Sequence, residues 1–232
     1  MNRIFNRWLE KKFEKVIDKS INDLTSIQIL KLNSRRNSAD FIQSHIQRVM
    51  IFSDRPRIQD YALDKSSSVS GDILEFGILG GKSLTRFDAF IRNNKLNKDL
   101  YGFDSFLGLG ESWTAINAYN EFDLDGKLPS NLPKSAKIVV GDVNITLPTF
   151  LKTYNNPISL VHIDTDAYAP AKSILKNLKG RFQKGTIVLF DDYHSLTGWE
   201  FGEHLALQEE LDKDFYRYLA FGPHQAAIEI LQ

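Results

Sequence analysis

The chain has 232 residues, of which 42% are hydrophobic and 25% are charged, so it can bury the core of a globular domain. Lys and Arg together number 29, as do Asp and Glu, and this balance argues against a dedicated nucleic-acid binder. There is no cysteine, which excludes disulfides, thiolate metal sites and a cysteine nucleophile, so any metal must be held by oxygen or imidazole.

Residues 1–65 are predicted to form a helical segment that precedes a body made of residues 66–232. An apolar stripe recurs there at helical spacing and consists of Phe5, Trp8, Leu9, Phe13, Val16, Ile17, Ile21 and Leu24. We expect this stripe to pack on the body or on a second copy, which would make a homodimer or larger homo-oligomer. An interfacial membrane helix is the alternative, but Glu10, Glu14 and Asp18 interrupt its basic face and weaken attraction to anionic lipid.

The N-terminal sequence is too densely charged for the apolar part of a signal peptide. No apolar run approaches the roughly 20 residues that a membrane span requires. We therefore expect a cytoplasmic protein without a membrane span.

From residue 71 onward, short apolar runs alternate with helical patterns. The apolar runs predict strands at residues 72–76, 100–103, 137–140, 158–163 and 185–190. The helical patterns cover residues 82–94, 146–154, 169–179 and 199–212. Such alternation is typical of a parallel sheet with crossover helices on both faces.

The C-terminal tail holds two further strand-like runs around Gly222 and Pro223, which predict an antiparallel hairpin at one edge of the sheet. The expected fold is therefore α/β, a doubly wound and mostly parallel seven-stranded sheet with an N-terminal helical segment.

The stretch GDILEFGILGGKSL (residues 71–84) resembles two nucleotide-binding motifs and fits neither. A phosphate loop would need glycine where Phe76 stands, and a dinucleotide-binding turn would need it where Leu79 stands. What remains is an acid, Glu75, followed by Gly77, Gly81 and Ser83 between a strand and a helix. This arrangement favours close approach of a cationic ligand over phosphate.

An acid lies at the carboxyl end of each of the five predicted strands: Glu75, Asp104, Asp142, Asp164 and Asp191. In a doubly wound sheet these positions share one edge, where ligands bind. Each acid taken alone could cap the next helix. Five carboxylates on one edge repel one another unless a cation compensates them, and a sulfonium cofactor with a metal would do so.

Five segments strengthen this interpretation: GFDSFLGL (102–109), GDVNITLP (141–148), LVHIDTDAYAPAKSIL (160–175), FDDYHSLTGWEFGE (190–203) and the glycine loop itself. Together they resemble the macrocin O-methyltransferase (TylF-like) family of class I S-adenosylmethionine-dependent methyltransferases. The resemblance covers residues 71–232 and matches residues 1–65 only in general character. It implies a Rossmann-like fold and metal-dependent methylation of hydroxyls, mainly on sugars and related small molecules.

The resemblance also implies the methionine half of a cofactor site. The loop from Gly77 to Gly81, which follows Glu75, would pass under this half of S-adenosylmethionine. Ser83 and the helix N-terminus would donate hydrogen bonds to its carboxylate.

The other half of the implied cofactor site lies after the next two strands. Asp104, with Ser105 beside it, is placed like the acid that binds the ribose hydroxyls. Asp142 and the backbone N–H of Val143 would hold the adenine, although a turn or helix cap also explains Asp142.

Four acids lie at the ends of the last two parallel strands and suit Mg²⁺, which prefers a few carboxylates plus water and substrate oxygens. By resemblance the ligands are Asp164, Asp191 and Asp192, and the spacing alone leaves Asp166 open as an alternative to Asp164. The hydroxyl that attacks the methyl group must lose its proton to a base. Asp166 is the first choice for this base and His194 the second.

Residues 107–135 are predicted to be irregular and to form a lid over the acceptor site. Their EFDLDG stretch resembles the start of a calcium loop, but it begins at Glu121 and has Leu132 where a bidentate glutamate is required. The aromatic side chains available to stack on a sugar are Trp113, Tyr119 and Phe122.

The predicted function is therefore metal-dependent O-methylation of a sugar or sugar-containing small molecule. The alternatives are the same fold and cofactor acting on a catechol or other aromatic hydroxyl, and a non-catalytic binding subunit. A dinucleotide oxidoreductase is disfavoured because Leu79 replaces the second motif glycine.

Overall fold

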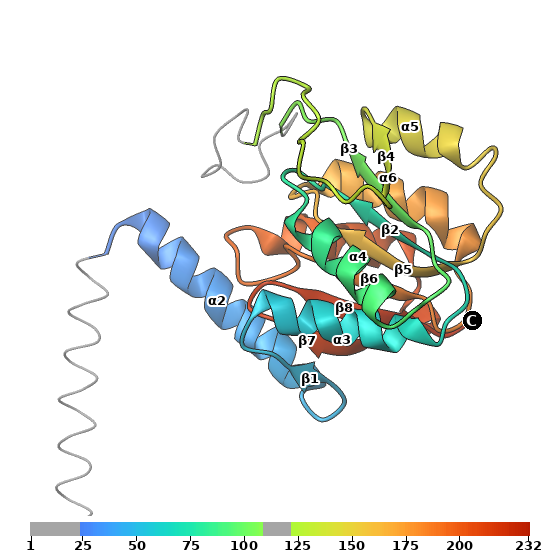
Figure 1. Ribbon diagram of the computed structural model, residues 1–232. Helices are drawn as coiled ribbons and strands as arrows, with labels where there is room; N and C mark the ends of the chain where they lie inside the picture. The colour runs from blue at the N-terminus through green and yellow to red at the C-terminus, as the bar shows by residue number, and fades with distance from the viewer. Residues whose placement is uncertain (1–23, 109–121) are drawn as a thin grey trace, which may run out of the picture.

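The computed structural model describes residues 24–108 and 122–232 (Figure 1). Its strands are β1 (Met50–Ile51), β2 (Asp72–Phe76), β3 (Leu100–Asp104), β4 (Lys137–Val140), β5 (Ile158–Ile163), β6 (Ile187–Phe190), β7 (Tyr216–Phe221) and β8 (Ala226–Ile230). Its α-helices are α2 (Ser26–His45), α3 (Arg55–Ser67), α4 (Lys82–Asn93), α5 (Val143–Phe150), α6 (Tyr168–Leu178) and α7 (Glu203–Glu210). Three short 3₁₀ helices are η1 (Lys179–Arg181), η2 (Trp199–Phe201) and η3 (Lys213–Phe215).

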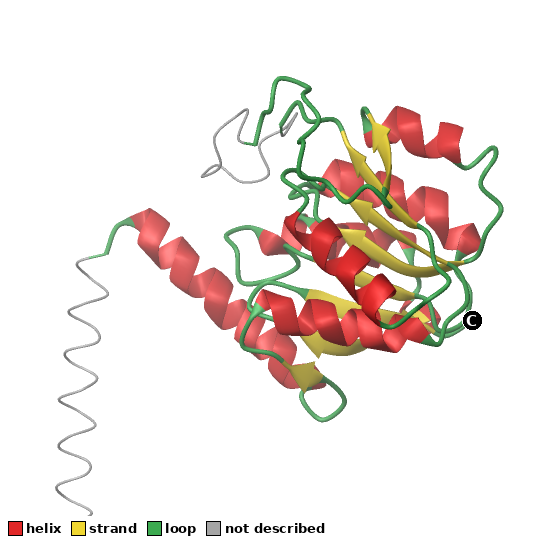
Figure 2. Ribbon diagram, viewed as in Figure 1, coloured by secondary structure: helices red, strands yellow, loops and turns green. Residues whose placement is uncertain are grey.

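All eight described strands form one sheet, in the order β1-β7-β8-β6-β5-β2-β3-β4. The central strands are parallel, and β8 runs antiparallel to both β6 and β7. Figure 2 shows helices covering both faces of this sheet. The predicted α/β fold, with its mostly parallel sheet and C-terminal hairpin, is confirmed.

The sheet has one strand more than the seven expected. Strand β1 lies inside the segment that was expected to be helical, and it pairs in parallel with the end of β7 (Met50 with Ala220, Ile51 with Phe221). Two residues cannot display the alternation that marks a strand in a sequence, so no pattern revealed it.

Two predicted helices have different limits in the structure. The helix expected at residues 146–154 is α5, which starts earlier because Asp142 caps it, accepting a hydrogen bond from the Asn144 N–H. The helix expected at residues 199–212 is divided into η2 and α7, because Gly202 between them has angles that are not helical (φ −96°, ψ −133°).

Two apolar clusters hold the layers together, one on each face of the sheet. Helices α3 and α4 pack on one face through side chains such as Ile58, Leu63 and Phe87, all 0% exposed. Helices α5, α6 and α7 pack on the other face. The boundary expected between residues 65 and 66 thus falls inside α3, a helix whose apolar side chains belong to the core of the body.

Helix α2 starts with a capping box in which Thr25 and Gln28 bond reciprocally. Near its end, Phe41 packs against Tyr218 and Phe221 of β7, with ring centroids 5.6 and 5.7 Å apart. Of the predicted N-terminal stripe, Leu24 alone falls within the described residues, so the expected packing or assembly through this stripe stays a prediction. Within residues 24–108 and 122–232, no helix combines the length and apolarity needed to cross a bilayer.

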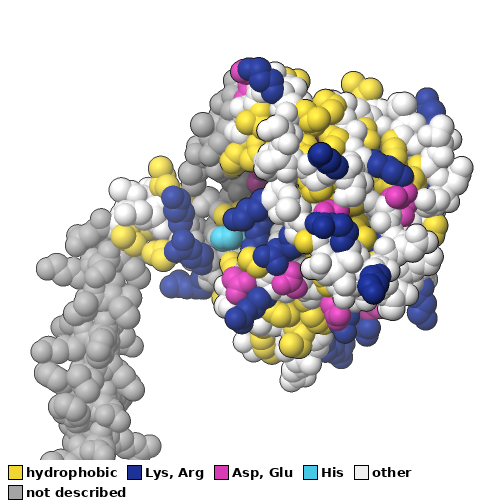
Figure 3. Space-filling view, in the orientation of Figure 1, with side chains coloured by type: hydrophobic (Ala, Val, Ile, Leu, Met, Phe, Trp, Pro, Cys, Tyr) yellow, Lys and Arg dark blue, Asp and Glu magenta, His cyan; other side chains and the backbone are white. Residues whose placement is uncertain are grey.

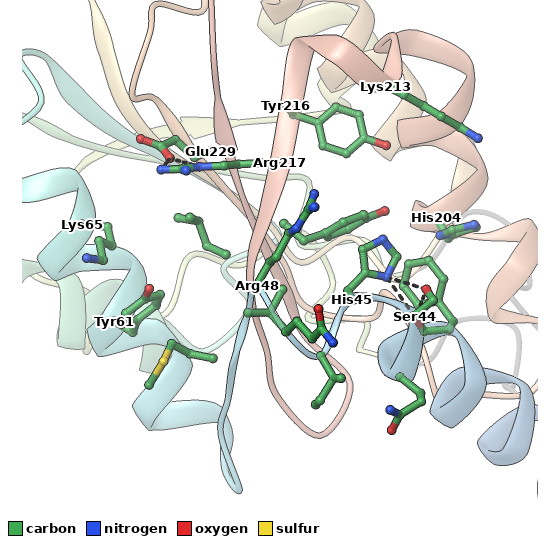
Figure 4. Close-up of a pocket in the computed structure, with 18 of the residues that line it drawn as sticks. Ser44, His45, Arg48, Tyr61, Lys65, His204, Lys213, Tyr216, Arg217 and Glu229 are labelled. Carbon is green, nitrogen blue, oxygen red and sulfur yellow. Dashed lines mark hydrogen bonds and ion pairs between the residues drawn. The ribbon is translucent and has the colours of Figure 1, made fainter.

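A groove of about 1550 Å³ lies between α2, β1 and β7 (Figure 4). Arg48, Tyr61, Lys65, His204 and Tyr216 are among its lining residues. None of the strand-end acids lines it, so this groove is separate from the carboxyl edge of the parallel strands.

Gly77, directly after β2, lies where the backbone of the glycine loop closely approaches the backbone at the end of β5. Its φ is +82°, and a Cβ placed on it would lie 1.7 Å from the carbonyl oxygen of Asp164. Nearby, the N–H of Asp164 donates to the carbonyl of Phe76 at 2.8 Å. Only glycine fits here, so Gly77 fixes the distance between the ends of β2 and β5.

We expect Gly77→Ala to lower the free energy of unfolding by about 2–4 kcal/mol, because overpacking adds to the strain of a positive φ. Urea unfolding measures this. Gly80→Ala is the matched control in the same loop, since a Cβ at Gly80 would meet nothing within 4 Å. Equal stability of the two variants would contradict the argument.

Candidate active site

The loop after β2 is held by Asp104 at the end of β3. One carboxylate oxygen of Asp104 accepts hydrogen bonds from the N–H groups of Ile78 and Leu79, at 2.8 and 2.7 Å. Its other oxygen accepts from the N–H of Phe106 at 2.7 Å. A carboxylate offers about four acceptor positions, so this one retains capacity for a further donor such as a ribose hydroxyl. The structure therefore places the carboxylate of Asp104 against the glycine loop.

Glu75 and Ser83, which lie on either side of the same loop in the sequence, are both buried and bonded to each other. Glu75 is 0% exposed; it accepts a short hydrogen bond from the Ser83 hydroxyl and lies 3.0 Å from Nδ1 of His162. The Ser83 hydroxyl is thus committed to Glu75 instead of a ligand carboxylate. Both residues position α4, whose N-terminus begins at Gly81 (φ +70°).

The residues expected at the adenine lie at the outer end of the same edge. The N–H of Gly141 donates to the carbonyl of Asp104 at 2.9 Å, which places the end of β4 beside the end of β3. Asp142 caps α5, with one oxygen accepting from both the backbone and the side chain of Asn144. The helix cap considered for Asp142 is therefore present. The Ser105 hydroxyl accepts from the N–H of Leu107 at 3.2 Å.

Part of the predicted lid lies over the glycine loop. Asn131 donates to the carbonyl of Gly80 at 3.0 Å, and a Cβ on Gly81 would come within 2.3 Å of Leu132. Phe122 is 44% exposed. Trp113 and Tyr119, also expected to stack on a sugar, lie outside the described residues.

The acids after β5 and β6 form the second half of the site. Oxygens of Asp164, Asp166 and Asp192 all lie within 4.8 Å of one another. Asp166 reaches this position from a left-handed backbone conformation (φ +54°). The group contains the alternative ligand Asp166 but not Asp191, which is part of the predicted ligand set and lies beside Asp164.

Asp191 instead faces two cations that the sequence analysis did not identify. Its Oδ1 lies 2.8 Å from Nε of Arg55 and 3.7 Å from Nε2 of His162. Arg55 also forms a short ion pair with Asp164. Burial lowers the pKa of His162, but the interactions with the carboxylates of Asp191 and Glu75 outweigh it and raise that pKa to about 10.

Glu203, at the start of α7, is a further acid that sequence reasoning missed. It is 0% exposed, and one of its oxygens accepts from the N–H of Asp192 at 3.1 Å. The other oxygen is buried without a hydrogen-bond partner among the described residues. Burial, followed by the charges of Asp191 and Asp164, raises the pKa of Glu203 well above its ordinary value.

His194 lies in the interior and is 1% exposed. Its Nδ1 is 2.8 Å from the Ser195 hydroxyl and its Nε2 is 3.2 Å from the carbonyl of Gln225. Burial lowers the pKa of His194 to about 4, against a hydrogen bond to Gln225 that raises it. Both ring nitrogens are engaged, which makes His194 poorly placed to take a proton from a substrate.

Asp164, Asp166 and Asp192, called the acid cluster below, fit a divalent cation in two respects: the atoms they offer as ligands, and their need for a compensating positive charge. All donors of the acid cluster are carboxylate oxygens, the ligands that Mg²⁺ prefers. Burial and the neighbouring Asp191 raise the pKa of Asp164 to about 8, although His162 and Arg55 oppose this. Burial and a hydrogen bond with Asp166 raise the pKa of Asp192 well above its ordinary value. Such shifts mark carboxylates that lack enough positive charge around them.

Helix α2 flanks this edge of the molecule. Its Ser38 accepts a hydrogen bond from the N–H of Ser195, in the segment after β6, at 2.7 Å. Figure 3 shows Lys and Arg side chains on both sides of the hollow between α2 and the body.

Residues 74–193, just over half of the chain, match a protein family described as a methyltransferase domain. The chain belongs to this methyltransferase family. The matched range runs from β2, before the glycine loop, through the paired acids after β6. No curated protein sequence matches the chain.

Solved structures of other methyltransferases share the fold. CalS11, a calicheamicin methyltransferase, aligns with a TM-score of 0.61 and 22% identity over 95% of this chain and 92% of its own. The apo form of CalS11, described as a TDP-rhamnose 3'-O-methyltransferase, aligns with a TM-score of 0.55 and 22% identity. The alignment covers 95% of this chain and 94% of the apo CalS11 chain. The O-methyltransferase NovP aligns with a TM-score of 0.56 and 17% identity over 75% of this chain and 79% of its own. These similarities show the shared fold, and the family match confirms the expected class of enzyme, a methyltransferase.

The raised pKa of Asp164 predicts how the stability of this methyltransferase depends on pH in EDTA. Between the ordinary value of 3.8 and about 8, the folded state holds a proton that the unfolded state releases. Stability therefore falls as pH rises through this window. We expect the free energy of unfolding of Asp164→Asn, which has no such proton, to fall less steeply than that of the wild type.

Urea unfolding at a series of pH values measures both slopes. Asp60→Asn is the control, because this exposed carboxylate pairs with Arg86 away from the cluster. The explanation is wrong if Asp164→Asn and the wild type have parallel profiles.

Proposed function

We propose that this methyltransferase transfers a methyl group from S-adenosylmethionine to a hydroxyl of a sugar or sugar-containing small molecule, with a divalent cation such as Mg²⁺ at the acid cluster. The observation that carries the proposal is the position of that cluster. Asp164, Asp166 and Asp192 lie within 4.8 Å of one another, and the backbone of Asp164 touches Gly77 of the glycine loop. The description of CalS11 as a TDP-rhamnose 3'-O-methyltransferase supports a sugar acceptor by analogy.

The proposed cofactor site lies across the ends of β2, β3 and β4. S-Adenosylmethionine supplies an activated methyl group on a sulfonium. Asp104 would bind the ribose while it holds the N–H groups of Ile78 and Leu79. Asp142 and the N–H of Val143 would border the adenine. The carboxylates at this edge favour a cofactor with a positive charge.

The proposed metal site uses Asp164 and Asp192, with Asp191 as the third predicted ligand. A bound divalent cation lowers the pKa of a coordinated hydroxyl and fixes its orientation. Glu203 would hold the backbone of Asp192 in place through its hydrogen bond.

Asp166 is the proposed base, since it lies in the same cluster and comes from the segment after β5. Its carboxylate would take the proton that the acceptor hydroxyl loses as the oxygen attacks the methyl carbon. His194, the second choice, is buried and already bonded through both ring nitrogens.

Calorimetric titration with S-adenosylmethionine tests the cofactor site. We expect Asp104→Ala to weaken binding at least about tenfold, because it removes a charged acceptor and frees the loop. Asp99→Ala is the matched control, since Asp99 lies before the opposite end of β3 and pairs with Lys137. Magnesium and EDTA should change this affinity little. Failure of the folded wild type to bind would contradict the cofactor site.

Asp166→Asn should lower the rate of methyl transfer by about 10²–10⁴-fold, the usual contribution of a general base. Its affinity for S-adenosylmethionine should stay unchanged. His194→Gln should keep most of the wild-type rate. Transfer of labelled methyl groups to panels of sugar nucleotides and catechols measures both variants.

The same assay separates the rival acceptors. Transfer to catechols alone would reject the sugar acceptor, and cofactor binding without any transfer would favour a non-catalytic subunit. A larger loss in His194→Gln than in Asp166→Asn would reverse the assignment of the base.

A further inference from the structure

Arg55 enters the acid cluster from a rigid starting point. It is the first residue of α3, between the cap Asp54 and Pro56. The Asp54 side chain accepts from the N–H of Arg57 at 3.0 Å, and proline in the first turn fixes the backbone for the helix. The backbone of Arg55 is therefore held in place, while its long side chain is free to change rotamer.

The guanidinium of Arg55 bridges two acids from adjacent strands. One terminal nitrogen pairs with Oδ2 of Asp164, and Nε lies 2.8 Å from Oδ1 of Asp191. Among the ion pairs of the described residues, no other Lys or Arg contacts these acids. The Arg55 side chain is 42% exposed, compared with 16% for Asp164 and 6% for Asp191. It thus reaches buried acids from a position with access to solvent.

Both partners of Arg55 belong to the predicted metal ligands. A cation such as Mg²⁺ binds carboxylate oxygens at about 2.0–2.1 Å. A guanidinium bonded to the same carboxylates would lie next to that cation, and the two positive charges would repel strongly at low dielectric. The guanidinium and the cation would therefore compete for Asp164 and Asp191.

We propose that Arg55 is a built-in counter-ion, which takes the place of the divalent cation in the metal-free protein and turns outward when the cation binds. This inference rests on the metal site of the proposed function. Arg55 stabilises the cluster when no metal is present and competes with the metal for Asp164 and Asp191. It therefore lowers the metal affinity of the site and sets the concentration of cation that the enzyme needs.

A different role for Arg55 would have the opposite effect. If Arg55 stayed bonded to Asp191 and oriented it for the metal, removing the arginine would weaken metal binding. The sign of the change in affinity therefore distinguishes a competitor from a supporting residue.

The test is titration of the full-length protein with Mn²⁺, followed by electron paramagnetic resonance of the free ion, and with Mg²⁺ by calorimetry. We expect Arg55→Gln to bind both cations about tenfold more tightly than the wild type, because the competing charge is gone. Its melting temperature in EDTA should fall by several degrees, and saturating Mg²⁺ should restore most of this loss.

Arg57→Gln is the matched control. Arg57 lies in the same helical turn, and its side chain is 71% exposed and pairs only with Asp54 among the described residues. This variant should match the wild type in metal affinity. If Arg55→Gln does not fold, Arg55→Lys serves instead, since a point charge cannot bridge two carboxylates as a guanidinium does. Its affinity should lie between those of Arg55→Gln and the wild type.

Unchanged or weaker metal binding by the folded Arg55 variant, beside a wild type that binds metal, would overturn this inference and leave the proposed function intact. Absence of metal binding in the wild type and in every variant would overturn both this inference and the metal site of the proposed function. Retained binding of S-adenosylmethionine in that case would show that only the metal site had failed.

Discussion

Electrostatic repulsion at one edge of the sheet is the constraint on which the rest of the site depends. Parallel strands place Asp164, Asp191 and Asp192 together, and the helix that follows adds Glu203. Buried carboxylates are costly unless protons, cations or hydrogen bonds compensate them. The protein supplies a part of this compensation through Arg55 and through other donors. With the pKa values of Asp164, Asp192 and Glu203 raised, this compensation is incomplete, and the proposed cation would complete it.

A buried chain of polar side chains links the two halves of the site. The Ser83 hydroxyl, at the start of α4, donates to Glu75, which in turn contacts His162. The other nitrogen of His162 faces Asp191 at 3.7 Å. Because these groups are buried, each depends on the next for its compensating charge or hydrogen bond. The glycine loop and the acid cluster therefore form one unit, and the contact of Gly77 with Asp164 adds a steric connection.

The sequence was sufficient to predict the features that recur along the chain, which are the apolar strands and the acids at their ends. The apolar runs located every strand of ordinary length, and the acids after them marked the edge that carries the site. The spacing could not tell that Asp142 caps α5 or that Glu75 faces inward, since both positions obey the same pattern as Asp104. His162 was hidden because a buried strand residue carries no signal of its own. Glu203 was hidden because its contact with Asp192 spans a loop whose path the sequence does not give.

Arg55 was missed for a different reason, which lies in the topology. Arg55 belongs to residues 1–65, which were predicted to form a helical segment separate from the body. Strand β1, which precedes Arg55, nevertheless pairs in parallel with β7, and the N–H of Phe52 donates to the carbonyl of Phe221 at 2.9 Å. Strand β7 ends at the carboxyl edge of the sheet, because β8 runs antiparallel to both β7 and β6. A chain that leaves β1 in this direction must enter α3 beside the strand-end acids. The pairing of only two residues, Met50 and Ile51, thus places the guanidinium of Arg55 against Asp164 and Asp191, although Arg55 lies outside the predicted methyltransferase domain.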